Sequence, residues 1–311
     1  MEREAELLEV PYFHVVFTLP HEFNEMAIKN PKEIYNALYK AAWQTIQTFA
    51  ADPKHLGAKT SMIAVLHTWG QSLSLHPHLH CIIPGGGINK NGEWVFPKKF
   101  GKNKQSKYLF PKRALSVVFR AKYMAELRKI LSIENHISRK VMEKKWVVYA
   151  KQPFFGPKAV IEYLGRYTHK IAISNHRILD ISNGQITFKY KDYRSQGSSK
   201  TMTLKACEFI RRFSLHVLPK GFRKMRNYGI LSSRSKAVDL NKAKAYFGME
   251  KWQKQKLTWE RIAKDKLNID LQTCRSCGKK TRIVIEEIFP QSAYKRGPPL
   301  MIKVAKLIWK S

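Results

Sequence analysis

The sequence predicts an α+β fold, with a central antiparallel sheet, helices packed on that sheet and a basic C-terminal extension. Short β-branched and aromatic runs bounded by proline or glycine are typical of strands, and longer segments repeat apolar residues at helical spacing. After residue 175 apolar and polar residues begin to alternate, and Lys and Arg become dense after 220. These patterns divide the chain into residues 5–175, an extension over 176–266 and a tail over 267–311.

The predicted elements follow from local signals. Asn30-Pro31 starts the clearest helix, because proline suits the first helical position and Glu33 completes a capping pattern. Gly156-Pro157 starts another in the same way, running to about His169. Strands are expected at residues 11–20, 61–69, 78–84, 146–149, 171–174, 186–193 and 201–205. Helices are expected at residues 31–49, 115–130, 156–169 and 209–217, and 98–107 is expected to be a basic loop.

Charge is the most unusual property of the composition. The 311 residues include 57 Lys+Arg and 23 Asp+Glu, which gives a formal net charge of +34. A nucleic acid is the usual partner of so basic a chain, although ribosomal and membrane-surface proteins share the property. The hydrophobic fraction of 44% indicates a folded protein and excludes a disordered tail.

Other features narrow the class further. Four cysteines are too few and too uneven for a disulfide framework. The N-terminus lacks the features of a secretion signal, and no apolar run reaches the ~20 residues that cross a bilayer. We therefore expect a cytoplasmic protein without a membrane partner. A phosphate-binding G-x-x-x-x-G-K-[ST] loop is absent from the sequence, so no ATP-driven step is expected.

The segment His76-Pro77-His78-Leu79-His80 is the first candidate for chemistry. Side chains two apart on a strand share a face, so His78 and His80 would point the same way. Two imidazoles at that spacing can share a divalent cation. The alternative is a pair of histidines that merely alternate on a half-exposed strand.

The second candidate is Tyr163-Leu164-Gly165-Arg166-Tyr167. Four residues along a helix bring two side chains to one face, so both hydroxyls would face one direction. Val160 and Leu164 would press the same helix on the sheet. A phenol is a poor nucleophile unless a cation stabilises the developing charge, so a neighbouring metal would make chemical sense of the pair. Amphipathic packing is the alternative explanation of the tyrosines.

Four stretches together resemble the two-tyrosine HUH transposases of the insertion-sequence-91 group. They are PYFHVVFTLPHEF (11–23), VLHTWGQSLSLHPHLHCIIPGGG (65–87), YAKQPFFGPKAVIEYLGRYTHKIAISNHRI (149–178) and EFIRRFSLHVLPKGFRKMRNYG (208–229). The resemblance implies that residues 5–175 form a nicking and strand-transfer domain. It also implies that His78 and His80 bind a divalent metal, Mg²⁺ or Mn²⁺, and that Tyr163 and Tyr167 are nucleophiles.

Two histidines leave a cation under-coordinated, so a third ligand is expected. Gln71 is the first choice, His67 the second and His76 the third. The cations expected to bind single-stranded DNA are Arg166, His169, Lys170, Arg211, Arg212, Arg223, Lys224 and Arg226.

Cysteines provide a further expectation. Family members commonly carry a cysteine-rich zinc-binding segment ahead of the first strand, and this chain begins too late to hold one, so we expect a shortened copy. Cys274 and Cys277 have the spacing of half a four-ligand site, which makes structural zinc a second candidate cofactor.

The expected activity is metal-dependent nicking of single-stranded DNA and strand transfer through a 5′-phosphotyrosine, in rolling-circle transposition. DNA would be the principal partner, with a host helicase as a second one. A plasmid replication initiator or relaxase would use the same chemistry and is the first alternative. A catalytically inactive single-stranded nucleic-acid-binding protein is the second.

Overall fold

A computed structural model describes residues 4–98, 108–151, 154–168, 171–192, 195, 197–253, 260–261, 263–264, 268–270, 273–274 and 277–279; for 154–155 and 166–168 it describes the backbone alone. Its contacts divide the chain into two units, Met1–Gln253 and Lys254–Ser311. The elements below all belong to the first unit. No helix in the described residues is long and apolar enough to cross a membrane.

A six-stranded antiparallel sheet forms the centre of the first unit, with strand order β11-β2-β3-β1-β6 and with β7 pairing the other end of β1. Its strands are β1 (Pro11–Thr18), β2 (Ser61–Trp69), β3 (Leu75–Pro84), β6 (Val148–Ala150), β7 (Phe154–Phe155) and β11 (Met225–Gly229). A small hairpin pairs β4 (Gly87–Ile88) with β5 (Trp94–Val95). The expected α+β class with a central antiparallel sheet is confirmed.

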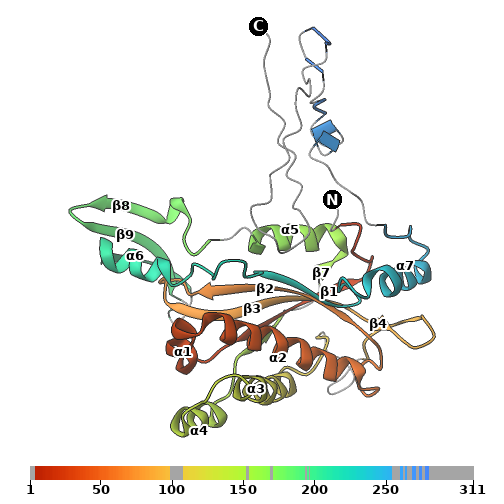
Figure 1. Ribbon diagram of the computed structural model, residues 1–311, viewed down its shortest axis with the longest axis horizontal. Coiled ribbons are helices and arrows are strands. Elements are labelled where there is room, and N and C mark those ends of the chain that lie inside the picture. The colour runs from red at the N-terminus through yellow and green to blue at the C-terminus, as the bar shows by residue number, and fades with distance from the viewer. Residues whose placement is uncertain are drawn as a thin grey trace, which may run out of the picture. The chain divides into compact units, whose positions relative to one another are not determined.

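Helices cover one face of this sheet, as Figure 1 shows. The long helix α2 buries Ile34, Leu38 and Ile46 against Leu79 and other odd-numbered residues of β3. The helices on this side are α1 (Asn24–Lys29), α2 (Pro31–Ala51), α3 (Lys112–Arg128) and α4 (Asn135–Glu143), after a short turn of helix, η1 (His21–Phe23). Pro31 is the first residue of α2, as expected.

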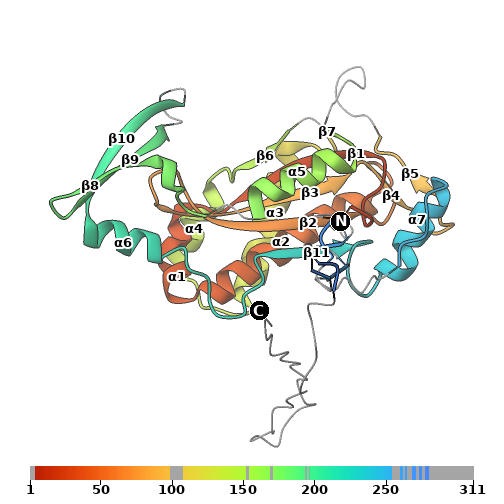
Figure 2. The ribbon, with the colours of Figure 1, turned by 90° about the horizontal axis from the view of Figure 1, so that it is seen from above.

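Helix α5 (Gly156–Thr168) crosses the opposite face (Figure 2). It buries Val160 and Leu164 against Tyr12, Ile63 and other residues that point away from α2. The predicted packing of Val160 and Leu164 on the sheet is therefore confirmed. Because α5 covers only part of this face, His78 and His80 of β3 stay partly exposed beyond it.

A second antiparallel sheet has the order β10-β9-β8, formed by β8 (Ile178–Ser182), β9 (Gln185–Asp192) and β10 (Ser198–Lys205). Helix α6 (Ala206–Ser214) follows it, and η3 (Asn175–Arg177) precedes it. Figures 1 and 2 place this group beyond one end of the central sheet, with η5 (Lys236–Leu240) and α7 (Asn241–Tyr246) beyond the other. Phe188 of β9 is fully buried against Leu73, which lies in the turn between β2 and β3.

Three side chains bind this turn to the second sheet and its helix. Arg177 donates to the carbonyl of Gln71 (2.5 Å), Arg212 to that of Ser72 (3.3 Å), and His216 Nε2 lies 3.1 Å from that of Leu73. Leu73 adopts a left-handed φ of 60° while its side chain is buried. These contacts fix the turn against the second sheet.

The structure corrects two expectations and adds a strand to a third. Residues 171–174 are not a strand; Ala172 and Ile173 instead pack beside Phe188. The helix expected over 209–217 ends at Ser214. The extension expected from 176 onward contributes β11 to the central sheet, although the boundary itself stays a prediction. Most of the expected loop at 98–107 lies outside the described residues.

Candidate active site

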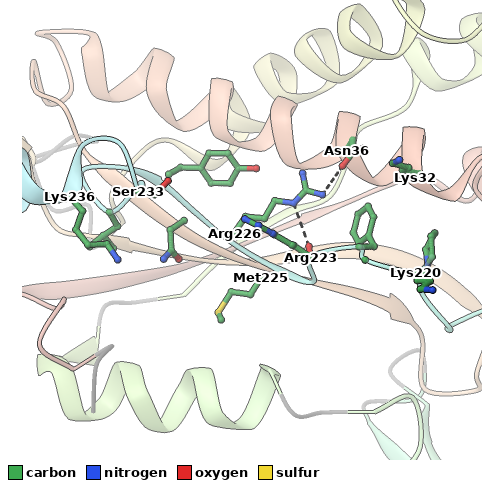
Figure 3. A pocket seen from close by; sticks show the side chains of 14 residues that line it. Lys32, Asn36, Lys220, Arg223, Met225, Arg226, Ser233 and Lys236 are labelled. Carbon is green, nitrogen blue, oxygen red and sulfur yellow. Dashed lines mark hydrogen bonds between the residues drawn. The ribbon is translucent and has the colours of Figure 1, made fainter. Parts of the chain in front are cut away.

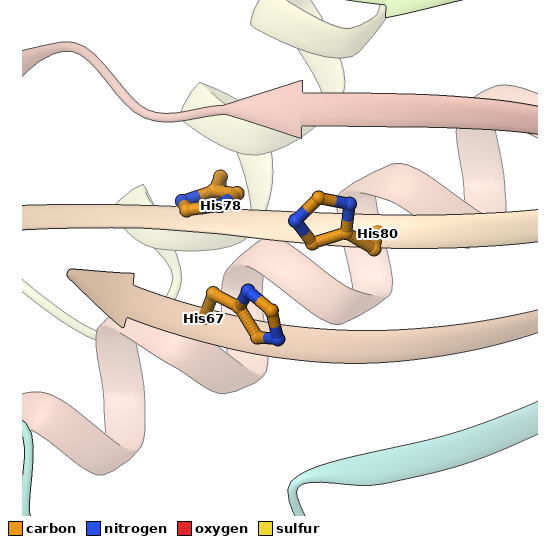
Figure 4. A group of neighbouring side chains, drawn as sticks. All are labelled: His67, His78 and His80. Carbon is orange, nitrogen blue, oxygen red and sulfur yellow. The ribbon is translucent and has the colours of Figure 1, made fainter. Parts of the chain in front are cut away.

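Three histidines meet on the sheet face that α5 leaves partly open. His78 and His80 share one face of β3, as predicted, while Leu79, Cys81 and Ile83 are buried on the other. The antiparallel register places His67 of β2 directly opposite His78. One nitrogen from each of the three rings lies within 4.8 Å of the others, an arrangement that could hold a metal ion (Figure 4).

A hydrogen bond orients the ring of His78, and packing holds the ring of His67. His78 Nδ1 lies 2.6 Å from the carbonyl oxygen of His76. A carbonyl only accepts, so Nδ1 must donate, which leaves the Nε2 lone pair available to a metal. The ring of His67 is buried and stacks on Trp69, with ring centroids 4.5 Å apart.

Tyr163 of α5 reaches the same cluster. Its hydroxyl lies 3.2 Å from His80 Nδ1 and 2.5 Å from Nε2 of His14, a buried residue of β1. His14 Nε2 in turn lies 3.0 Å from His80 Nδ1. The hydroxyl makes both of its hydrogen bonds if it donates to His14 Nε2 and accepts from His80 Nδ1–H, and His80 Nε2 is then available to a metal.

The environment keeps the His14 ring neutral. Burial, together with the nearby positive charge of Lys151 and an electrostatic interaction with His78, lowers the pKa of His14 to about 4. A neutral ring has one acceptor nitrogen, which the contact with the Tyr163 hydroxyl requires. His14 was not among the residues predicted from the sequence, and its place in the matched stretch at 11–23 is the signal that could have identified it.

The other predicted site residues lie in different places. Gln71 follows β2 in the turn and lines the same groove as the three histidines, as does His76. The side chain of Tyr167 lies outside the described residues, as do those of Arg166, His169 and Lys170. Arg211 and Arg212 both pair with Glu208 on α6.

An open groove of about 780 Å³ extends from the histidines toward the second sheet. Its floor includes His67, His78 and His80. One wall is formed by Trp69 and the turn after it, and the other by Tyr190, Lys191, Asp192 and Met202 of β9 and β10. Lys224 lies near this groove, with its ammonium 5.0 Å from the Trp69 ring centre.

A second groove, of about 670 Å³, runs along β11, the edge strand of the central sheet (Figure 3). No acidic residue is among the described side chains that line it. The cations that line it are Lys32, Lys220, Arg223, Arg226 and Lys236. Lys236 is paired with Glu6.

Arg226 has a structural environment in this groove. Its guanidinium donates to Asn36 Oδ1 (2.6 Å) and lies 4.1 Å from the ring centre of Tyr39 and 5.0 Å from that of Phe222. Arg223 is exposed, as are Lys32 and Lys220. The sequence pattern could not separate Arg223 from Arg226, because Arg226 lies in β11, a strand that was not predicted, and Arg223 precedes it.

Cys274 and Cys277 lie in the second unit. Gly278 N–H donates to the Cys274 carbonyl (2.9 Å), and Gly278 adopts a left-handed φ of 68°. Most of this unit lies outside the described residues, so the zinc site stays a prediction.

Comparison with known proteins identifies the family. Residues 61–238 match the transposase family described as "Putative transposase" (Y2_Tnp). This match includes His67, His78, His80 and Tyr163, and it covers more than half of the chain. The chain belongs to this family.

Two relatives are transposases. "Putative transposase y4qJ" of Sinorhizobium fredii (strain NBRC 101917 / NGR234) is 44% identical over 266 residues, which are 80% of this chain and 65% of that protein. The "Transposase for insertion sequence element IS801" of Pseudomonas savastanoi pv. phaseolicola is 27% identical over 281 residues, 88% of this chain and 67% of that protein. The chain thus spans about two thirds of the length of these relatives.

Solved structures of the conjugative relaxase TrwC bound to DNA are also similar to this chain. One metal-free complex aligns with 50% of this chain and 72% of the relaxase, at 13% identity and a TM-score of 0.30. A complex with a 27-mer DNA aligns with 65% of this chain and 71% of the relaxase, at 14% identity and a TM-score of 0.31. Similarity at this level supports no conclusion about the site.

Proposed function

We propose that this chain is a DNA transposase that nicks single-stranded DNA by attack of Tyr163 and transfers the attached strand to a target. The observation that carries the proposal is the contact of the Tyr163 hydroxyl with His80, one of three histidines whose nitrogens converge. Packing alone would not require the polar end of a helix side chain to contact two imidazoles. Membership of a transposase family favours transposition over plasmid replication or conjugation as the setting.

The proposed step exchanges one phosphodiester for another. The Tyr163 oxygen loses its proton and attacks the phosphorus, and the bond to the 3′ oxygen breaks. That oxygen takes up a proton, so a 5′-phosphotyrosine and a 3′-hydroxyl result. His14 accepts a hydrogen bond from the phenol, so it holds the attacking oxygen in place. In the reverse reaction a 3′-hydroxyl of the target attacks the phosphotyrosine and frees the tyrosine. Tyr167, one helical turn away, is proposed as the nucleophile for a second cleavage.

Nitrogen donors of His67, His78 and His80 would hold a divalent metal, which would draw charge from the phosphate oxygens. Magnesium and manganese are the metals expected from the sequence. A set of three imidazoles is more typical of iron, nickel, copper or zinc than of magnesium, so we favour Mn²⁺ over Mg²⁺ because it accepts nitrogen ligands more readily. Zinc at Cys274 and Cys277 is a separate structural proposal.

Single-stranded DNA is the proposed substrate. The acid-free groove along β11 would bind phosphates through Lys32, Lys220 and Arg223, and Lys224 lies closer to the histidines. Arg226 is proposed to support the groove rather than bind phosphate, because its guanidinium already contacts Asn36 and two rings. A host helicase as partner stays a prediction.

A nicking assay tests the proposal. A single-stranded oligonucleotide from the border of the element is incubated with the full chain in EDTA, then with Mg²⁺, Mn²⁺ or Zn²⁺ added back. We expect nicking with at least one of the three metals and none in EDTA. Binding of the oligonucleotide without nicking under every condition would favour an inactive DNA-binding protein.

A further inference from the structure

We propose that the groove between the three histidines and β9 binds the nucleotides that flank the phosphate to be cut, and that Tyr190 stacks against one of their bases. This inference rests on the proposed function, since it assigns the flanking nucleotides once the histidines hold the phosphate. It identifies Tyr190 as a residue that helps select the cleavage site. Four observations support it.

The groove is continuous with the histidine cluster. His67, His78, His80 and Tyr190 all line it, and its volume is about 780 Å³. A phosphate held at the histidines would therefore have its neighbouring nucleotides in or beside this space. The opposite wall comes from the second sheet, a part of the chain that the chemistry itself does not use.

Strand periodicity places Tyr190 in the groove. Ile186, Phe188 and Tyr190 alternate on one face of β9, and the first two are buried while Tyr190 is partly exposed. Tyr190 thus ends the apolar stripe of the strand, where it packs at the edge of the core around Phe188 and also lines the groove. Within the described part of the chain no other ring stacks on Tyr190, so a ring face can receive a base.

The charges beside Tyr190 are compatible with DNA. Asp192, two residues along the same face, is paired with Lys200, whose ammonium lies 2.7 Å from its carboxylate. Lys200 is also the direct cross-strand neighbour of Tyr190. The single carboxylate of this wall is therefore neutralised, while Lys191 adds a positive charge.

The wall is held in place. Arg177 donates to the carbonyl of Lys189 on β9 as well as to that of Gln71 in the turn after β2. Arg212 and His216 contact the next two carbonyls of the same turn. The distance between Tyr190 and the histidines is therefore set by a bonded framework, which a selective contact requires.

The test measures nicking rates on a series of single-stranded oligonucleotides in which each nucleotide around the nick is replaced in turn by an abasic one. With the unchanged chain, one position should slow nicking about tenfold, because the stacked base is missing. Tyr190→Leu keeps apolar bulk but removes the ring, so it should nick the intact oligonucleotide about tenfold more slowly than the unchanged chain does. The abasic nucleotide at that position should cause no further slowing in this variant. Tyr190→Phe keeps the ring, so nicking by this variant should again be slowed by the abasic nucleotide at that position.

Tyr246→Leu is the matched control, because Tyr246 is half exposed on α7, outside both grooves. Equal rates for Tyr190→Leu and the unchanged chain would overturn the inference, and so would an unchanged chain that tolerates every abasic position. Both results leave the proposed function intact. An unchanged chain that nicks no oligonucleotide would overturn the proposed function and this inference with it.

Discussion

At the scale of single residues, the strand register identifies His67 as the third histidine of the cluster. The β2–β3 register places it opposite His78, and its ring centroid lies 4.6 Å from that of His80. Gln71, the first choice from the sequence, lies beyond the end of β2, because that strand ends at Trp69 after an irregularity in the ladder. Spacing along the chain could not give this register.

The two candidates for the third ligand can be separated by mutation. We expect His67→Ala to weaken Mn²⁺ binding by more than about a hundredfold, since loss of a direct ligand should exceed the effect of losing an outer contact. Gln71→Ala should bind Mn²⁺ as the unchanged chain does. Isothermal titration calorimetry measures both. The opposite pattern, with Gln71→Ala impaired and His67→Ala normal, would identify Gln71 as the ligand.

At the scale of helices and strands, Glu126 joins α3 to α2. It is buried, and it binds Lys40 (2.6 Å), Lys129 (2.8 Å) and Gln44 (3.0 Å). Burial alone would raise the pKa of Glu126, but these hydrogen bonds outweigh it and lower the pKa to about 2. A depressed pKa means that the carboxylate stabilises the fold above its unfolded value of about 4.3 and loses this effect as the pH falls toward 2.

We therefore expect Glu126→Gln to lower the free energy of unfolding at neutral pH by roughly 1–2 kcal/mol, because charged hydrogen bonds are replaced by weaker ones. The difference from the unchanged chain should shrink as the pH approaches 2. Urea denaturation at several pH values measures it. Glu25→Gln, at an exposed pair with Lys29, is the control. A difference that stays constant down to pH 2 would contradict this account.

Elements with strong local patterns could be predicted from the sequence, and β2 has the predicted bounds of residues 61–69. The strand β11 could not, because Met225–Gly229 is short and has Arg226 and Asn227 at its centre, and its partner β2 lies far upstream. A glycine is required where β11 ends: Gly229 has a left-handed φ of 63°, and a Cβ there would lie 2.0 Å from the Thr60 carbonyl. His14 was missed for a similar reason, since its partners are distant in sequence.

At the scale of the whole molecule, part of the net charge of +34 is gathered in the groove along β11. Among the cations of the β11 groove, Lys32, Lys220 and Arg223 are exposed, and the described residues give them no ion pair. Replacing all three by Gln should reduce the slope of log affinity against log salt by about 2 for single-stranded DNA. Fluorescence anisotropy over a salt series measures this.

The control triple variant removes the same charge elsewhere, at Arg113, Arg139 and Lys145 on or beside α3 and α4. These residues are exposed and lie outside both grooves. Its salt slope should match that of the unchanged chain. Equal slopes for the two triple variants would mean that binding follows bulk charge and not the groove.

The central claim is that Tyr163 attacks the DNA, and mass spectrometry of the trapped protein–DNA adduct tests it most directly. We predict that the DNA-linked peptide of the first cleavage contains Tyr163, because its hydroxyl contacts His80 and His14. Tyr163→Phe should fold normally and lose that adduct, while Tyr246→Phe should retain it. A linked peptide without Tyr163, or an adduct that persists unchanged in Tyr163→Phe, would contradict the account.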